Sequence, residues 1–181
     1  MMYRAAATLV VLLVSLTTSF DSGGKTSAAS DLIKVEIMKL LNVPQDHGVV
    51  LVLRPEQAPR DGGAERVLAL AIGFEEARSI GVAFEKIQFP RPLSHDLMKK
   101  IIDEYGGTVT DCVITKMENS TFFAELHLKR GGRQISVDRR PSDGIALVMR
   151  TGAPIFVRRE VMEKFGIDPY GADKPEKAIT T

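Results

Sequence analysis

Apolar and polar residues alternate along much of the chain with the period of two that is typical of β-strands. Where the alternation stops, short continuous apolar runs indicate strands that are buried on both faces. Segments of these two kinds are residues 32–40, 48–54, 66–73, 108–117, 121–129, 133–137 and 154–157. Short linkers rich in Gly, Asn and Ser separate several of them, and such spacing is typical of antiparallel hairpins.

A helical period of apolar residues appears in four isolated blocks. They cover residues 74–86, about 95–105, a stretch from 141 that ends before Gly152, and 158–166. In the second block, a helical wheel predicts a core face made of Leu97, Met98, Ile101, Ile102 and Tyr105. Hairpins with interspersed single helices predict an α+β fold in one domain, with a largely antiparallel sheet.

The first 29 residues have the pattern of a cleavable N-terminal segment. A single Arg4 precedes 16 uncharged residues that end at Asp21. This pattern predicts a secretory signal peptide, or alternatively an uncleaved membrane anchor. The folded domain is expected to cover residues 31–165, and residues 166–181 are expected to form a flexible polar tail. The protein is therefore expected to be exported, either to a periplasm or outside the cell, unless this N-terminal segment anchors it to a membrane.

The charge balance limits how the chain could hold nucleic acid. Removing residues 1–29 leaves 22 basic and 22 acidic residues, a net charge of zero. Nucleic-acid binding would then need a local basic patch or a metal ion. Cys112 is the single cysteine, so the chain forms no intramolecular disulfide, and its place in an alternating strand predicts a small apolar filler.

One phrase occurs twice: "RPLSHD" and "RPSD" each place Arg-Pro, Ser and Asp before a run of helix formers. Ser94 and Ser142 suit helix N-caps, and Asp96 and Asp143 suit first turns, where the helix dipole favours a carboxylate. Under this interpretation Asp96 is a solvated charge four residues before Lys100.

His95 supports a second interpretation of the phrase. The wheel places it at the edge of the core face, where burial and a helix N-terminus disfavour the imidazolium. A neutral ring of this kind accepts a proton or binds a metal, whereas the alternative is a cap or a bond to a backbone carbonyl. Because side chains of adjacent helical residues diverge, a partner other than Asp96 is needed.

Basic residues gather in the stretch 129–140, which holds five Lys or Arg and one acid. Ile135 and Val137 are expected to face inward, with Asp138 on the other face of the strand. Arg139 and Arg140 fall at the turn into the next helix, which predicts a clamp for a phosphate or carboxylate. The alternative is a solvated basic hairpin.

Three segments, "IGFEEARSI", "RPLSHDL" and "DRRPSDGIALVMRTGAPIFV", resemble the bifunctional nuclease family, which is named for plant members that cut both DNA and RNA. The resemblance covers about residues 31–165. It includes the following residues: Gly73, Glu76, Ala77, Arg91, Pro92, Ser94, His95, Asp96, Leu97, Asp138, Arg140, Pro141, Ser142 and Asp143. Arg139 stands where a small residue such as Ala is more usual in the family, and Gly144 stands where Ala is.

The clustering of acids, arginines and one histidine at two helix starts motivates a first hypothesis, a metal-assisted phosphodiesterase acting on nucleic acid. The candidates for catalysis are His95, Asp96 and Asp143, those for phosphate binding are Arg91, Arg139 and Arg140, and those for holding Mg²⁺ or Mn²⁺ are Asp138 and Asp143 with Glu76 or Asp96. Oxygen ligands are the ones both ions prefer.

The second hypothesis is a non-catalytic module that grips an anionic ligand, a polypeptide or another copy of itself. A membrane is expected as a partner only through an uncleaved N-terminal segment. An assay separates the two hypotheses: cleavage of nucleic acid supports the first, and saturable, salt-sensitive binding without turnover in any metal supports the second. The most informative structural observation is whether His95, Asp138, Arg140 and Asp143 share one cleft.

Overall fold

The computed structural model describes residues 31–43, 48–57 and 65–169. The predicted signal peptide or anchor lies outside the described residues, as does most of the predicted tail. The chain remains paired slightly beyond residue 165, because Ile167 forms an isolated bridge with Val67. Within the described part, no helix has the length and apolarity needed to cross a bilayer.

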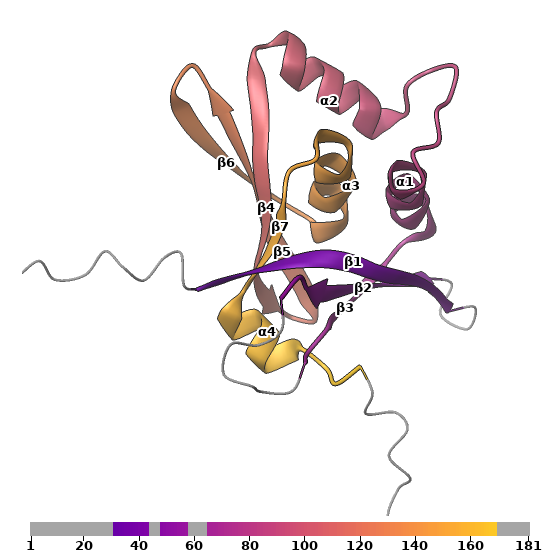
Figure 1. Ribbon diagram of the computed structural model, residues 1–181, viewed down its shortest axis with the longest axis vertical. Helices are drawn as coiled ribbons and strands as arrows, with labels where there is room; N and C mark the ends of the chain where they lie inside the picture. The colour runs from indigo at the N-terminus through magenta and orange to yellow at the C-terminus, as the bar shows by residue number, and fades with distance from the viewer. Residues whose placement is uncertain (1–30, 44–47, 58–64, 170–181) are drawn as a thin grey trace, which may run out of the picture.

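A single sheet organises the described residues, with strand order β3-β2-β1-β7-β4-β5-β6 (Figure 1). Its strands are β1 (Leu32–Val43), β2 (Gly48–Pro55), β3 (Leu68–Ile72), β4 (Gly107–Glu118), β5 (Thr121–Arg130), β6 (Arg133–Arg139) and β7 (Ile155–Arg158). All neighbouring strands are antiparallel except β7 and β4, which run parallel. The prediction of an α+β fold with a largely antiparallel sheet is confirmed.

The helices are α1 (Phe74–Phe84), α2 (Ser94–Glu104), α3 (Pro141–Thr151) and α4 (Arg159–Phe165). In the centre of the fold, α3 contacts α1, α2, β4 and β5. Its residues Ile145, Ala146, Leu147 and Val148 have no exposed surface, because neighbours cover the helix on several sides. Packing around α3 therefore sets where the starts of α1 and α2 lie.

Gly144 explains how closely α3 approaches the sheet. A Cβ atom at this position would lie 2.5 Å from Sγ of Cys112 and 3.0 Å from Cδ of Arg139. Cys112 is fully buried, as expected for an apolar filler. The absence of a side chain at residue 144 thus leaves room for the large Arg139, so the two departures from the usual family pattern are accommodated together.

The core face predicted for α2 is largely wrong. Leu97, Met98, Ile101 and Tyr105 are exposed, and only Ile102 packs against the core. The reason is that α2 lies against α3 and the start of β4 rather than across the sheet. Its inward side carries polar groups, so the apolar stripe faces away from the rest of the molecule.

The predicted N-caps are displaced by one or two residues. Leu93 is the N-cap of α2, so Ser94 is already in the first turn. Arg140 is the N-cap of α3, and Pro141 occupies the first helical position, where its missing N–H costs no hydrogen bond. Ser142 is therefore inside the helix and buried.

Candidate functional site

The first turns of α2 and α3 meet at His95. Its Nε2 atom lies 3.8 Å from Oδ1 of Asp143, and its Nδ1 atom shares a hydrogen bond of 2.9 Å with Oγ of Ser79 on α1. The two Arg-Pro phrases, which begin 49 residues apart at Arg91 and Arg140, thus come together in space. The ring is held between a hydroxyl on one helix and a carboxylate on another.

His95 is kept neutral by its surroundings. Burial lowers the pKa of its imidazole below the ordinary 6.5, and the nearby Arg150 charge lowers it further. The carboxylates of Asp143 and Asp96 act in the opposite direction without reversing the shift. Only 14% of the side chain is exposed. A neutral imidazole able to accept a proton is therefore present at neutral pH.

Arg140 bridges two carboxylates beside His95. Its Nη1 donates to Glu76 Oε1 at 2.8 Å, while Nε and Nη2 donate to the two oxygens of Asp143 at 2.8 and 3.0 Å. The bonds to Asp143 raise the pKa of the guanidinium. Since 64% of the side chain is exposed and three of its five N–H groups make these bonds, two remain directed to solvent. Two carboxylates balance its charge, so the site presents fixed hydrogen-bond donors rather than a net cation.

Gly73 provides the space that Glu76 occupies. A Cβ atom at residue 73 would overlap Oε2 of Glu76, whose carboxylate folds back over the start of α1. Glycine at the N-cap of α1 therefore lets Glu76 reach Arg140 from the first turn of the helix. This explains physically why these two residues belong to one motif.

Asp96 has a different partner from the expected Lys100. It accepts hydrogen bonds from Nε of Arg150 and from the backbone N–H of Leu93. Burial alone would raise the pKa of its carboxyl, but these two bonds outweigh it and lower the pKa. Asp96 thus joins α2 to α3, and its predicted catalytic role stays a prediction.

Arg150 was missed by sequence reasoning, although a lone Arg in the apolar run "GIALVMR" is a signal for a buried ion pair. Its side chain is 6% exposed, and Nη1 donates to the backbone carbonyls of Ser79 and Ala146. Arg150 therefore touches all three helices around His95. Ser79, the other missed residue, carries no comparable signal.

The register of β6 separates Asp138 and Arg139 from the cluster. Arg139 pairs with Ala124, on the face that α3 covers, and its guanidinium donates to Val137 O at 3.2 and 3.1 Å. Burial lowers its pKa. Asp138 pairs with Glu125 and so lies on the opposite face of the sheet. Of the consecutive residues 138–140, only Arg140 bonds to Asp143, the carboxylate beside His95.

The predicted metal ligands do not form one donor set. Asp138 is on the far face of the sheet, and the carboxylates of Glu76 and Asp143 are both bound to Arg140. Across the described residues, no group of three or more His, Cys, Asp or Glu side chains is arranged to hold a metal ion. The side chains around His95 therefore do not fit a resident Mg²⁺ or Mn²⁺. Arg91 is exposed in the connection between α1 and α2, and its phosphate-binding role stays a prediction.

A second histidine cluster lies on the sheet face away from α3. His127 contacts Asp111 through Nδ1 at 2.5 Å and Glu125 through Nε2 at 3.3 Å, and Ser136 donates to Glu125 at 3.0 Å. The side chain of His127 is 22% exposed, close to the value for His95. Within the described residues, no arginine is hydrogen-bonded to the carboxylates around His127, in contrast to Arg140 beside His95. His127 is therefore a suitable comparison for His95.

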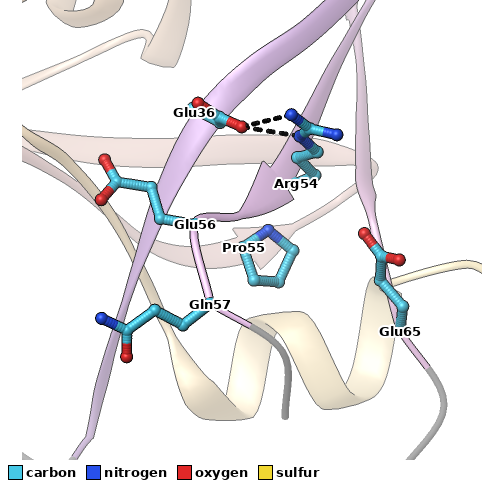
Figure 2. A pocket seen from close by; sticks show the side chains of 6 residues that line it. All are labelled: Glu36, Arg54, Pro55, Glu56, Gln57 and Glu65. Atoms are coloured by element: carbon cyan, nitrogen blue, oxygen red, sulfur yellow. Dashed lines mark hydrogen bonds and ion pairs between the residues drawn. The ribbon is translucent and has the colours of Figure 1, made fainter.

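A shallow pocket lies elsewhere, beside β1 and β2. Figure 2 shows the residues that line it, which are Glu36, Arg54, Pro55, Glu56, Gln57 and Glu65. Its volume is about 280 Å³, and Nε of Arg54 donates to Glu36 at 2.7 Å. Three carboxylates against one guanidinium disfavour a phosphate. The predicted site residues are all outside this pocket.

The comparisons with known proteins agree with the motifs at the helix starts. A family model described as the bifunctional nuclease domain matches residues 59–169. The chain belongs to the bifunctional nuclease domain family. In this bifunctional nuclease domain the match begins after β2, yet β1 and β2 are hydrogen-bonded into the same sheet as the matched strands. The structural unit is thus larger than the matched stretch.

Relatives come from bacteria and plants. An uncharacterized protein from Mycobacterium tuberculosis is 33% identical over 124 residues, covering 68% of this chain and 70% of the relative. Bifunctional nuclease 1 from Oryza sativa subsp. indica is 27% identical over 146 residues, covering 75% of this chain and 44% of the relative. Bifunctional nuclease 2 from Arabidopsis thaliana is 30% identical over 98 residues, covering 52% and 30%. This bifunctional nuclease domain therefore matches less than half the length of those plant proteins.

Proposed function

We propose that this chain is an exported nuclease that hydrolyses phosphodiester bonds in DNA and RNA, with His95 as the base that activates water. The observation that carries the proposal is the neutral, largely buried imidazole of His95 held between Ser79 and Asp143, beside the exposed guanidinium of Arg140. Membership of the bifunctional nuclease domain family supports the choice of substrate. Export rests on the pattern of residues 1–29 alone.

The proposed step begins at Nε2 of His95, which takes a proton from a water molecule. The resulting hydroxide attacks phosphorus, and the bond from phosphorus to the leaving sugar oxygen breaks, with solvent supplying the proton to that oxygen. Asp143 stabilises the imidazolium that forms, because its Oδ1 lies 3.8 Å from Nε2.

Arg140 supplies hydrogen-bond donors for the phosphate. Two of its N–H groups are free to donate to the non-bridging phosphate oxygens, where negative charge develops during attack. Glu76 and Asp143 hold the guanidinium in one orientation. Arg91 would add a second contact to the phosphate from the connection before α2.

The test uses the chain without residues 1–29 and fluorescent single- and double-stranded DNA and RNA, each with EDTA, Mg²⁺ or Mn²⁺. We expect cleavage that His95→Ala and Arg140→Gln reduce by about 100-fold or more, the range for loss of a general base or an electrostatic stabiliser. His127→Ala is the matched control, because it removes a similarly buried histidine on the other face. Cleavage that survives unchanged in His95→Ala contradicts the proposal and points to a contaminating nuclease.

One observation favours a second function, a non-catalytic module that binds an anionic ligand. Lys129, Arg130 and Arg133 are exposed at the β5–β6 turn, on the last strand pair of the sheet. The same protein preparations distinguish the two functions. Saturable, salt-sensitive binding of nucleic acid without turnover in any of the three metal conditions favours the binding module.

A further inference from the structure

We propose that a second copy of this chain covers an apolar face formed by α2 and β6, so that the protein is a two-fold symmetric dimer. The face consists of Leu97, Met98, Ile101, Tyr105, Ile135 and Val137, and we call it the α2–β6 face. The proposal does not depend on the nuclease activity, since its evidence and its test concern association alone.

The stripe along α2 is the first part of the evidence. Leu97, Ile101 and Tyr105 are spaced four residues apart and lie on one side of the helix, with 49%, 49% and 67% of their surfaces exposed. The opposite side carries Asp96, which is bonded to the buried Arg150. An amphipathic helix normally buries its apolar side. In α2 the inward side carries an ion pair, which leaves the apolar side without a cover.

The inner face of β6 is the second part. Ile135 pairs with Leu128 and Val137 pairs with Leu126, so both lie on the face that packs into the core at β5. They are nonetheless 44% and 39% exposed, because β6 ends the sheet beyond the cover of α3. β6 is an edge strand, and its free edge has no neighbouring strand in the described part of the fold.

The two parts lie at the same end of the molecule. Figure 1 shows α2 and the tip of the β5–β6 hairpin together at the top of the view. The guanidinium of Arg130, at the end of β5, lies 5.9 Å from the ring centre of Tyr105, just after α2. This contact joins the helical stripe to the hairpin.

The size of the α2–β6 face suits a dimer. From the exposed fractions, its six side chains leave roughly 600 Å² uncovered, at the upper limit of about 600 Å² for the largest apolar patch on a typical monomer. A stable interface buries about 800 Å² on each partner, of which roughly 65% is apolar in homodimers. The apolar part of such an interface is thus already present on one copy.

The charges around the face include both signs, as a self-complementary interface requires. Arg130 and Arg133 border it at the hairpin, whereas Glu104 lies in the last turn of α2, next to Asp103, which pairs with Lys99. A two-fold arrangement lets the basic hairpin of one copy approach the acidic helix end of the other.

The test measures mass by sedimentation velocity and light scattering, with the full chain and with a version that begins at Asp31. We expect both to have twice the mass of one chain, which is 19.8 kDa for the full chain, at micromolar concentration. Ile101→Glu and Ile135→Glu should each weaken dimerisation by at least about 100-fold, because each places a charge in the apolar centre. Both positions are partly exposed, and circular dichroism would verify that the variants fold.

Leu41→Glu on β1 is the matched control, since Leu41 is 42% exposed but lies outside the face. It should leave the dimer intact. A monomeric unmodified chain overturns the proposal, as does a dimer that both Glu variants retain. Dimers formed by the full chain but not by the version from Asp31 would assign association to the first 30 residues. A monomer that instead binds anionic vesicles through this face would assign it to lipid.

Discussion

The Asp96–Arg150 pair predicts an asymmetric response to mutation. Arg150 is 6% exposed, whereas the side chain of Asp96 is 38% exposed. Removing the carboxylate by Asp96→Asn leaves a buried guanidinium without its counter-charge. Removing one partner of a buried pair costs about 3–5 kcal/mol, and because Asn retains a hydrogen-bond acceptor, we expect about 3 kcal/mol.

Arg150→Met should cost less. Methionine fills much of the space of the arginine stem, and water can solvate the Asp96 that remains. The loss is then mainly that of charge-assisted hydrogen bonds, roughly 1–2 kcal/mol in net stability. The double variant should be close to Arg150→Met alone, because the cost of Asp96→Asn arises from the unpaired arginine.

Urea-induced unfolding followed by circular dichroism would measure these differences. Asp103→Asn is the control, since Asp103 pairs with Lys99 on the exposed side of the same helix and should lose less than about 0.5 kcal/mol. The reasoning is refuted if Arg150→Met destabilises more than Asp96→Asn, or if Asp96→Asn matches the control. The first result would assign the role of Arg150 to its backbone hydrogen bonds alone.

Three further predictions follow from burial. Burial and Arg150 lower the pKa of His95, so its NMR titration midpoint should be below 6.5 and should rise in Arg150→Met. Because the unfolded state binds this proton more tightly, the contribution of His95 should reduce stability as pH falls below 6.5. A midpoint at or above 6.5 contradicts this prediction. Gly144→Ala should destabilise the fold by about 1–3 kcal/mol through overpacking against Cys112 and Arg139, and Cys112→Ala should recover part of that loss in thermal unfolding. Burial raises the pKa of the Cys112 thiol to about 12, so disulfide reagents at pH 8 should modify it only after unfolding, and rapid modification of the folded protein would show that the site opens.

Much of the fold could be predicted from the period of apolar residues. Alternation located the strands, and short linkers indicated hairpins, because both signals are local. The exposed side of α2 could not be predicted in this way. A wheel identifies the apolar side of a helix but not which neighbour covers it, and in α2 the ion pair made by Asp96 takes the inward position.

The candidate site was partly visible in the sequence. The repeated phrase singled out His95, Arg140 and Asp143, because helix starts concentrate charged side chains in a recognisable pattern. Arg150 lies 54 residues from Asp96, and no local pattern links residues so far apart. Asp138 was grouped with the site because it is close to Arg140 in sequence, whereas strand alternation directs it to the other face.

Residues 138–140 show how far neighbours in sequence diverge where β6 leads into α3. Asp138 faces solvent on the outer side of the sheet, Arg139 lies beneath α3 at Gly144, and Arg140 bonds to Glu76 and Asp143. A mutational scan of three adjacent codons would therefore report on three local environments: the exposed face of the sheet, the packing of β6 against α3, and the ion pairs beside His95. Arg139 still couples them, because its guanidinium interacts electrostatically with Asp138 and with Asp143, the partner of Arg140.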